Sequence, residues 1–272
     1  MKISCIIPTC DRPEFLIEAI NSVLKQTLLP AEIIIVNNGR GPLNLPPQIA
    51  EEVKIHDIAP YVGAAQARNF GASVAIGDYL AFLDDDDLWS AAYLENVSQA
   101  IAKGAVCLIS RLDMLIDGKI VPGKNAHGKI TLDKLLVQNP GTGGPNTVIS
   151  KKLFFAVGGY DPKLPTSEDK SLIIELIKRG EKITTLPDNQ VIARYHKATS
   201  RLSDDKNIAE GIYQFTKKYS SLMNKKQYFY NWYKIFYHRY KSGDVLAGVF
   251  CFFLCLFYAP KSIIKKALRL FK

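Results

Sequence analysis

Four consecutive aspartates, Asp84–Asp87, follow directly on the apolar run Tyr79–Leu83, and this junction constrains the fold of the 272-residue chain more than any other feature. The run is typical of a buried strand, and open α/β sheets bind ligands at the carboxyl ends of their strands. Two carboxylates about 6 Å apart repel each other by roughly 2–3 kcal/mol at an effective dielectric near 20. A divalent cation that prefers hard oxygen ligands, Mg²⁺ or Mn²⁺, would offset this repulsion. The alternative is a solvated acidic turn before a helix that begins near Ser90.

The first hundred residues alternate between segments typical of strands and segments typical of helices. Short apolar runs predict buried strands, and apolar residues spaced three and four apart predict helices. The order of these segments predicts an α/β fold with a Rossmann-like, mostly parallel sheet and helices on both faces. The predicted strands are Lys2–Pro8, Ala31–Val36, Val53–Ile58 and Tyr79–Leu83, and the predicted helices are Glu14–Gln26, Gly63–Ala75 and Ser90–Lys103. The first helix has five apolar residues on one face: Phe15, Ala19, Ile20, Val23 and Leu24.

The second hundred residues predict further strands and helices separated by glycine-containing turns. An Asp-Gly pair between two apolar stretches predicts a tight hairpin over Leu115–Val121. Ser167 predicts the start of a helix that runs to Arg179 and ends at Gly180. The other predicted elements are the strand Ala105–Ser110, the loop Asn139–Asn146, the strand Thr147–Ser150 and the helix Lys151–Val157, which Gly158 ends.

The net charge of +9 is concentrated at one end of the chain. Residues 211–272 contain twelve Lys and Arg but a single acid, Asp244, so they carry +11 and residues 1–210 carry −2. The uncharged run Val245–Ala259 has fifteen residues, fewer than the roughly 20 of a spanning helix. This pattern predicts a peripheral tail that binds an anionic membrane surface rather than a nucleic acid, the alternative being a helix that packs on the rest of the chain. The basic residues beyond the run are Lys261, Lys265, Lys266, Arg269 and Lys272.

The cysteines and the start of the chain indicate the compartment. Cys5, Cys10, Cys107, Cys251 and Cys255 form no CxxC pair, which favours thiols in a reducing compartment over a disulfide framework or a zinc site. The sequence enters its first predicted strand without a signal peptide before it, so cytosolic synthesis is expected.

Several short segments occur in the order and spacing of family 2 glycosyltransferases, and together they resemble that family from residue 3 to about residue 200. The resemblance implies a GT-A fold, a nucleotide-sugar donor, a divalent metal and inversion at the anomeric carbon. It also implies a nucleotide-sugar-binding half at residues 1–103 and an acceptor-binding half at 104–210, and the composition of residues 211–272 predicts the basic, aromatic, helical tail that follows them. The segments that carry the resemblance are Ile6–Pro13, Ile35–Gly39, Gly63–Asn69, Phe82–Trp89, Gly158–Asp161 and Ser167–Asp169.

The resemblance assigns the aspartate cluster to the metal and the donor. A metal ion there would neutralise the diphosphate as it leaves, with Asp86 and Asp84 as ligands and Asp84 or Asp85 on the ribose. The register within the four aspartates stays open by one position. His196 is the third implied metal ligand, with a structural or exposed histidine as the alternative. The other implied donor-binding residues are Pro8, Thr9, Asp11, Arg12, Asn38 and Arg68.

Arg68 and Asn38 differ from the other implied donor-binding residues in their sequence context. Arg68 lies among small residues, where its guanidinium could bridge nucleotide and carboxylates or form a salt bridge to the cluster. Asn37-Asn38 departs from the Asp-Asp-Gly that the family usually has after this strand. The amide oxygen of Asn38 still accepts a hydrogen bond, so uridine remains the favoured nucleoside.

The acceptor side depends on residues farther along the chain. Inverting transfer requires a base for the acceptor hydroxyl, and Asp169 resembles the family's base, with Glu168 beside it on the acceptor. Acids in the first turn of a helix also complement its dipole without any catalytic role. Gly143 and Gly144 are assigned either to the acceptor pocket or simply to a turn.

The sequence therefore predicts an inverting, metal-dependent glycosyltransferase on the cytoplasmic face of the inner membrane. A lipid-linked saccharide acceptor in surface-polysaccharide synthesis fits the basic tail. One competing function is a nucleotidyltransferase that makes sugar nucleotides, which would need a glycine-rich phosphate loop after the first strand. A phospho-accepting receiver domain would be about half this length. A non-catalytic membrane-bound module with the same fold is the third alternative.

Overall fold

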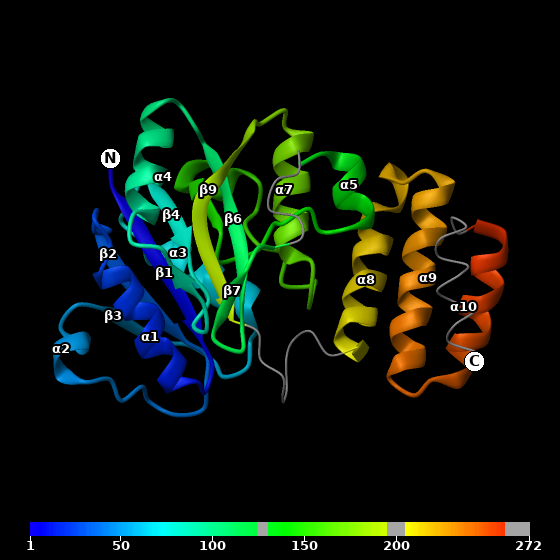
Figure 1. Ribbon diagram of the computed structural model, residues 1–272, viewed down its shortest axis with the longest axis horizontal. Coiled ribbons are helices and arrows are strands. Elements are labelled where there is room, and N and C mark those ends of the chain that lie inside the picture. The colour runs from blue at the N-terminus through cyan, green and yellow to red at the C-terminus, as the bar shows by residue number, and fades with distance from the viewer. Residues whose placement is uncertain (124–129, 195–204, 259–272) are drawn as a thin grey trace. The chain divides into compact units, whose positions relative to one another are not determined.

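The computed structural model describes residues 1–123, 130–194 and 205–258, and the chain contacts divide into two compact units. The first unit comprises Met1–Ile130, Asn139–Pro162 and Leu172–Lys197. The second comprises Thr131–Gln138, Lys163–Ser171 and Ala198–Lys272. Figure 1 follows the chain through both. His196 and the basic residues at 261–272 lie outside the described residues, and the functional division at residues 103 and 210 stays a prediction.

A single mixed sheet organises the first unit, with nine strands among the described residues in the order β3-β2-β1-β4-β8-β6-β9-β5 and β7 paired to β6. The strands β3, β2, β1 and β4 run parallel, and β8 then enters antiparallel. The parallel half matches the predicted βα alternation. The strands are β1 (Ile3–Thr9), β2 (Glu32–Asn37), β3 (Lys54–Asp57), β4 (Tyr79–Phe82), β5 (Leu88–Trp89), β6 (Cys107–Ile116), β7 (Lys119–Val121), β8 (Thr147–Ser150) and β9 (Ile183–Arg194).

Helices cover both faces of this sheet, as the sequence predicted (Figure 1). Side chains that alternate along β1 pack on α1 (Pro13–Leu24) and α4 (Tyr93–Ala102) in one core. On the opposite face α3 (Ala64–Val74) approaches so closely that a Cβ at Gly71 would lie 2.5 Å from Ile6 Cγ2. The short helices α2 (Pro47–Ala50) and α6 (Lys151–Ala156) complete the first unit, and α7 (Glu168–Lys178) begins in the second unit and continues in the first.

The predicted apolar face of α1 is confirmed for Ala19, Ile20 and Val23, which are buried, and Leu24 packs partly buried against the same core. Leu16 is also buried, whereas Phe15 is half-buried and lies under the guanidinium of Arg194 at 5.1 Å. The helix predicted from Ser90 begins at Tyr93. Leu88 and Trp89 form β5 against β9, which keeps the chain extended up to Ser90.

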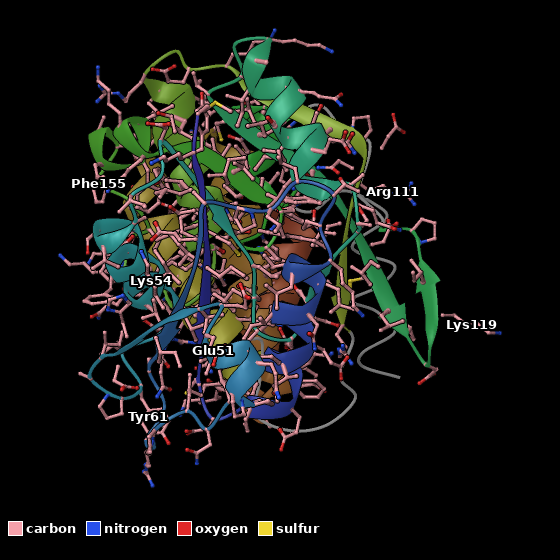
Figure 2. The ribbon with its side chains drawn as sticks, turned by 90° about the vertical axis from the view of Figure 1, so that its left-hand side faces the viewer. Glu51, Lys54, Tyr61, Arg111, Lys119 and Phe155 are labelled. Atoms are coloured by element: carbon pink, nitrogen blue, oxygen red, sulfur yellow. The ribbon has the colours of Figure 1, made fainter. Side chains whose placement is uncertain are left out.

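The predicted Asp-Gly hairpin is confirmed. Ile116 pairs with Lys119 across the turn, and Asp117 and Gly118 have φ values of 47° and 76°. Two successive positive φ values are the requirement of the tight turn that matches strand twist. Figure 2 shows Lys119 on this hairpin, at the side of the first unit.

The second unit is helical. α8 (Asp205–Tyr219) packs on α9 (Lys225–Lys241), and α9 packs on α5 (Leu132–Val137) and on α10 (Val245–Tyr258) (Figure 1). The short helix η1 (Ser220–Leu222) joins α8 to α9. Asn224 begins α9 with a reciprocal capping box to Gln227. Among the helices that the structure describes, none has both the length and the apolar character needed to cross a membrane.

Candidate active site

The carboxyl ends of β1, β2 and β4 bring the predicted donor residues to one edge of the sheet. Thr9 pairs with Asn37 at the ends of β1 and β2, and Ile6 pairs with Phe82 where β4 ends. Asp84–Asp87 therefore begin beside the turn that follows β1. Three neighbouring parallel strands supply one cluster of polar side chains, which is the arrangement that open α/β sheets use to bind ligands.

Asp85 is the buried member of the aspartate cluster. Its Oδ2 accepts hydrogen bonds from Thr9 Oγ1 at 2.8 Å and from the Cys10 amide at 3.4 Å. Burial, followed by the charge of Asp86, raises the pKa of Asp85 to about 6. The Thr9 hydroxyl, which the sequence assigned to the nucleotide, thus donates to Asp85 and joins β1 to the cluster.

Arginines face the two more exposed aspartates. Arg12 Nη1 lies 3.0 Å from Asp86 Oδ2 and 3.6 Å from Asp85 Oδ1. Arg68 Nη2 forms an ion pair with Asp84 Oδ1. Asp84 and Asp86 keep 29% and 20% of their side-chain surface exposed, so a ligand can reach both carboxylates.

Arg68 is held from three sides. Only 3% of the residue is exposed, and its guanidinium lies 5.3 Å from the ring centroid of Tyr160. The backbone of Gly144 covers another side, because a Cβ there would lie 2.4 Å from Arg68 Nη2. Only glycine fits at position 144 without displacing Arg68, and the sequence alone did not indicate this. The equivalent Cβ at Gly143 would meet nothing closer than 3.4 Å.

Arg194, which the sequence did not assign to the site, contacts the aspartate cluster through Asp87 and Asp86. Asp87 Oδ1 accepts a hydrogen bond from the Arg194 amide at 3.0 Å, and Arg194 Nε donates to the Asp86 carbonyl at 3.2 Å. Burial, followed by the charge of Asp84, raises the pKa of Asp87 well above its ordinary value. Arg194 also pairs with Glu18 at 2.5 Å. These contacts join the end of β9 to the cluster, and no local motif around Arg194 could have indicated them.

The ends of β1 and β2 form a second group of polar side chains. Asp11, with φ of 55°, accepts hydrogen bonds from the Arg40 amide at 3.0 Å and from the Tyr61 hydroxyl at 2.8 Å. Arg40 lies over the Tyr61 ring at 5.3 Å. Tyr61 is 53% exposed and lies at the lower end of the view in Figure 2. An exposed ring beside a fixed carboxylate is suited to a planar, polar ligand, and the sequence had not singled out Tyr61.

The two adjacent asparagines have different surroundings. Asn37 Nδ2 donates to the Gly41 carbonyl and to Asp57, and its Oδ1 accepts from the Gly39 amide, so this side chain shapes the turn. The side-chain amide of Asn38 forms no hydrogen bond with any residue that the structure describes, although its backbone is bonded to Thr9 and Tyr61. Asn38 therefore has hydrogen-bonding capacity left for a ligand.

Comparison with known proteins decides the family. Residues 4–155, more than half of the chain, match the family model described as Glycosyl transferase family 2.

The chain belongs to glycosyl transferase family 2.

Curated relatives agree. An uncharacterized glycosyltransferase of Haemophilus influenzae is 26% identical over 211 residues, which cover 75% of this chain and 71% of that protein. The Escherichia coli protein UDP-Glc:alpha-D-GlcNAc-diphosphoundecaprenol beta-1,3-glucosyltransferase WfgD is 27% identical over 209 residues, which cover 75% and 80%. The predicted glycosyltransferase activity is thereby confirmed.

A solved structure supports the fold. The structure of S. aureus TarS 1-349 in complex with UDP-GlcNAc superimposes with a TM-score of 0.63 and 17% identity, over 88% of this chain and 81% of that one. The predicted GT-A fold is confirmed.

Few side chains of the candidate site could coordinate a metal ion. Among the described residues no group of three or more His, Cys, Asp or Glu side chains is arranged to hold an ion. Asp84 and Asp86 offer two partly exposed carboxylates, and Mg²⁺ is usually bound by one or two carboxylates together with substrate phosphates. The residues present therefore fit an ion whose remaining ligands come from substrate and water.

The residues predicted for the acceptor side lie on segments other than those that form the aspartate cluster. Glu168 and Asp169 occupy the first turn of α7, in the second unit. Gly143 lies in the first unit on the loop before β8, where its carbonyl accepts a hydrogen bond from Thr147 Oγ1 at 2.6 Å. Their roles toward an acceptor stay predictions, as does the ligand role of His196.

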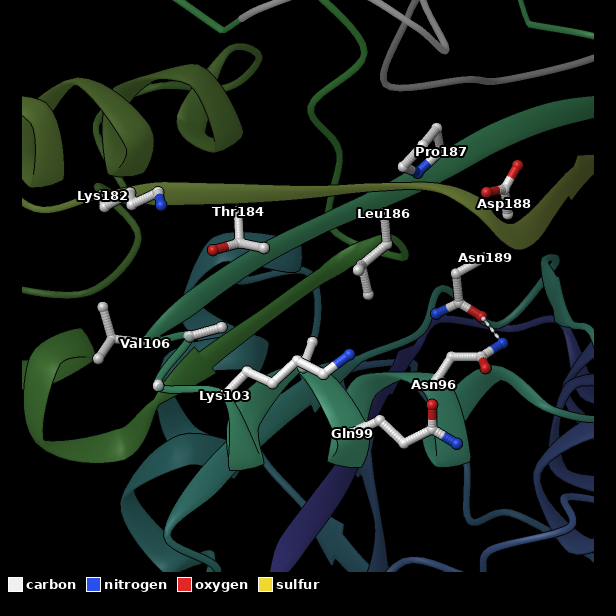
Figure 3. A pocket seen from close by; sticks show the side chains of 13 residues that line it. Asn96, Gln99, Lys103, Val106, Lys182, Thr184, Leu186, Pro187, Asp188 and Asn189 are labelled. Atoms are coloured by element: carbon white, nitrogen blue, oxygen red, sulfur yellow. Dashed lines mark hydrogen bonds between the residues drawn. The ribbon is translucent and has the colours of Figure 1, made fainter.

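A separate cavity of about 480 Å³ lies in the first unit, lined by α4, the residues just before β6 and the first half of β9 (Figure 3). Asn96, Gln99 and Lys103 face Thr184 and Asp188 across it, and Asn96 Nδ2 donates to Asn189 Oδ1 at 3.2 Å. Because β6 runs parallel to β4 through the antiparallel β8, the start of β6 is at the opposite edge of the sheet from Asp84–Asp87. This cavity is therefore not part of the candidate active site.

Proposed function

We propose that the chain transfers a sugar, with inversion, from a UDP-sugar to a lipid-linked saccharide in surface-polysaccharide synthesis. The observation that carries the proposal is the pairing of Arg12 with Asp86 and of Arg68 with Asp84 at the ends of two adjacent strands. Each pair combines a cation that could bind a diphosphate oxygen with a carboxylate that could bind the counter-ion. The relative WfgD is named for a UDP-Glc donor and a diphosphoundecaprenol acceptor, and the TarS structure is a complex with UDP-GlcNAc.

The arginines and aspartates divide the work on the donor. When bound, a divalent Mn²⁺ or Mg²⁺ ion would supply Lewis-acid stabilisation of the leaving diphosphate. Asp86 and Asp84 would hold that ion, and His196 is the further ligand that the family resemblance implies. Arg68, which Tyr160 and Gly144 keep in place, would bind phosphate oxygens with little loss of side-chain freedom.

The nucleoside would lie at the ends of β1 and β2. Asn38 has an amide without a hydrogen-bond partner among the described residues, which suits the edge of uracil. Asp11 is fixed by Tyr61 and by the Arg40 amide, and the exposed Tyr61 ring offers a surface for stacking. Pro8 and Thr9 shape the floor of this region at the end of β1.

On the acceptor side, Asp169 would take the proton from the attacking hydroxyl, with Glu168 as a neighbouring acceptor contact. The test is Asp169→Asn, a nearly isosteric change. We expect retained binding of the donor and a loss of kcat of about 10²-fold or more, the usual scale for removing a general base. The matched control is Glu168→Gln in the same helical turn. Turnover of Asp169→Asn within a few-fold of the original enzyme would contradict the assignment.

The donor is tested by its hydrolysis. UDP-, GDP- and dTDP-sugars are offered in turn, with Mn²⁺ and then with excess chelator. We expect hydrolysis of a UDP-sugar that stops when the ion is removed. Undiminished hydrolysis in chelator would contradict the metal, and a preference for GDP- or dTDP-sugars would contradict the uridine assignment.

We also propose that the protein acts peripherally at the cytoplasmic face of the inner membrane. Support comes from α10, where Val245, Leu246, Val249, Phe250 and Phe253 are between 47% and 75% exposed. Such a large contiguous apolar surface is uncommon on a soluble monomer. The basic residues that follow it in the sequence would meet anionic headgroups, each contributing about 1 kcal/mol.

Vesicle flotation tests this placement. The full chain should float with anionic vesicles at low salt and dissociate as salt is added. A variant with glutamine at Lys261, Lys265, Lys266, Arg269 and Lys272 should stay at the bottom of the gradient. Glutamine at Lys103, Lys151 and Lys182 of the first unit is the control and should float. If the full chain does not float with anionic vesicles at low salt, the membrane placement is wrong.

A further inference from the structure

Two lysines of the second unit, Lys170 and Lys234, lie close together, and a third, Lys218, contacts the residue that follows Lys170 in the sequence. Lys170 comes from the first turn of α7, Lys218 from α8 and Lys234 from α9. None of the three has a role in the function proposed above. Lys170 is buried and Lys234 is half-buried, whereas Lys218 is exposed, and like charges that lie close together in a helical core oppose folding unless something offsets them.

Lys170 is the least compensated of the three. The residue is 6% exposed, and its Nζ lies 3.8 Å from the ring centroid of Phe215. Among the residues that the structure describes, its ammonium group has no hydrogen-bond acceptor and no carboxylate within ion-pair distance. Burial lowers the pKa of Lys170 to about 8, although the charges of Asp169 and Glu168 act in the opposite direction. One aromatic face is weak compensation for a desolvated ammonium group.

Lys234 adds a second ammonium group beside the first. Its Nζ donates to the Val137 carbonyl at 2.5 Å and lies 5.2 Å from the Tyr230 ring centroid. Burial, followed by the positive charge of Lys170, lowers the pKa of Lys234 well below its ordinary value. The bond to Val137 gives Lys234 a structural role, because a cation there satisfies a carbonyl at the end of α5. The same explanation does not extend to Lys170.

Lys218 and Ser171 complete the cluster. Lys218 Nζ donates to Ser171 Oγ at 3.0 Å, and Ser171 Oγ lies 2.6 Å from the Tyr219 hydroxyl. Ser171 directly follows Lys170 on α7. Lys218 itself is exposed to solvent, so the buried ammonium group that lacks an anionic partner among the described residues is that of Lys170.

We propose that Lys170, with Lys234 beside it, binds the diphosphate group that joins the saccharide to the lipid in the acceptor. This proposal rests on the function proposed above, in which Asp169 receives the proton of the acceptor hydroxyl. In a monosaccharide diphosphate the attacked hydroxyl and the diphosphate are separated by one sugar ring, so their protein partners must be close together. Asp169 and Lys170 are consecutive residues in one helical turn. The diphosphate offsets the charge that Phe215 alone leaves uncompensated.

The first experiment uses inorganic pyrophosphate on the full chain in EDTA, so that metal-dependent donor binding is absent. The Cε resonance of Lys170 in ¹³C-lysine-labelled protein is followed through a pH titration, and Lys170→Met assigns it. Pyrophosphate should raise the pKa of Lys170 from about 8 toward the ordinary value of 10.5. An unchanged titration at 10 mM pyrophosphate, or an equal change with chloride at the same ionic strength, would overturn the proposal.

The second experiment separates the two sources of a diphosphate. Farnesyl diphosphate and UDP are titrated into the Asp86→Ala variant in EDTA. Tighter binding of farnesyl diphosphate supports the lipid-linked acceptor, whereas equal or tighter binding of UDP overturns that assignment. Neither measurement requires turnover, so they remain informative even if the proposed reaction is wrong.

Variants connect the site to catalysis. Lys170→Met should fold at least as well as the original chain, because it removes a desolvated charge. It should raise KM for a diphosphate-linked acceptor about tenfold or more, the scale of a charge-assisted contact, and leave donor hydrolysis within a few-fold. Lys178→Met, an exposed lysine of α7 paired with Glu175, is the matched control and should change neither. An unchanged acceptor KM in both Lys170→Met and Lys234→Met would overturn the proposal.

Discussion

The two edges of the parallel half-sheet treat their carboxylates in opposite ways. At the amino edge, Glu32 accepts hydrogen bonds from Ser4 Oγ, Lys54 Nζ and the Ile76 amide, all between 2.6 and 2.8 Å. Burial alone would raise the pKa of Glu32, but Lys54, Ser4 and Ile76 together lower it below its ordinary value. This carboxylate is fully satisfied by the protein itself.

At the carboxyl edge the protein gathers more negative charge than it neutralises. Burial and the neighbouring acids raise the pKa of both Asp85 and Asp87, even though Thr9 and the Arg194 amide donate to them. Arg12 pairs with Asp86 and Arg68 with Asp84, and both carboxylates keep part of their surface exposed. The same sheet therefore builds one edge for stability and leaves the other with binding capacity for a ligand. A ligand-binding edge costs folding free energy that the rest of the unit must supply.

The largest expected effect comes from removing a carboxylate at the carboxyl edge, where negative charge is not fully neutralised. Asp86→Ala should lower turnover by about 10³-fold or more, because the donor loses its ion and Arg12 loses the nearer of its two carboxylate partners. Circular dichroism should show an intact fold, and calorimetry should show weakened Mn²⁺ binding. Asp188→Ala, an exposed acid of the first unit outside the cluster, is the control and should keep full activity. If Asp86→Ala kept activity near that of the control, the conclusion that the carboxyl edge binds the donor would be wrong.

A smaller effect is expected from the glycines that precede β8. In Gly144→Ala the new methyl group would overlap the guanidinium of Arg68, whose buried setting leaves it little room to move. We expect donor hydrolysis to fall by about 10-fold or more, as for a displaced positioning group. Gly143→Ala differs by one residue and places its Cβ no closer than 3.4 Å to any atom, so its donor hydrolysis should be nearly unchanged. Equal losses in the two variants would show that the loop, and not Arg68, is the sensitive element.

The sequence predicted the half-sheet well because its signals are local. β1 and β4 were predicted to within one residue at each end, and β8 at both ends, from apolar runs and turn residues. The position of Asp84–Asp86 at the end of a strand was also predicted, because one segment of sequence contains both the strand and the aspartates. The start of α4 was misplaced because β5 exists only through its pairing with β9, about a hundred residues later.

The unpredicted parts of the site share the same cause. Arg194, Tyr61 and the packing of Gly144 on Arg68 all depend on contacts between segments distant in sequence. Lys170 lies next to the predicted base, yet its chemistry comes from Phe215 and Lys234, which only the fold brings to it. Local motifs identify which residue types are present, whereas burial and pairing decide what each of them does.

The smallest effect concerns the amino edge and appears in stability rather than activity. Glu32→Gln removes the charge that Lys54, Ser4 and Ile76 stabilise, and should cost about 1–3 kcal/mol of unfolding free energy at pH 7 while turnover stays close to normal. Because the folded-state pKa of Glu32 lies below the unfolded value of about 4.3, its contribution is fully present above that pH and is lost as the pH falls through the folded value. Urea unfolding of both proteins between pH 7 and pH 3.5 should therefore give curves that converge at the acid end.

The raised pKa of Asp85, about 6, has the opposite sign, so Asp85→Asn should gain stability relative to the original chain as the pH rises from about 4 to about 6. Parallel trends in the two variants would mean that the two edges do not differ in the way their contacts indicate.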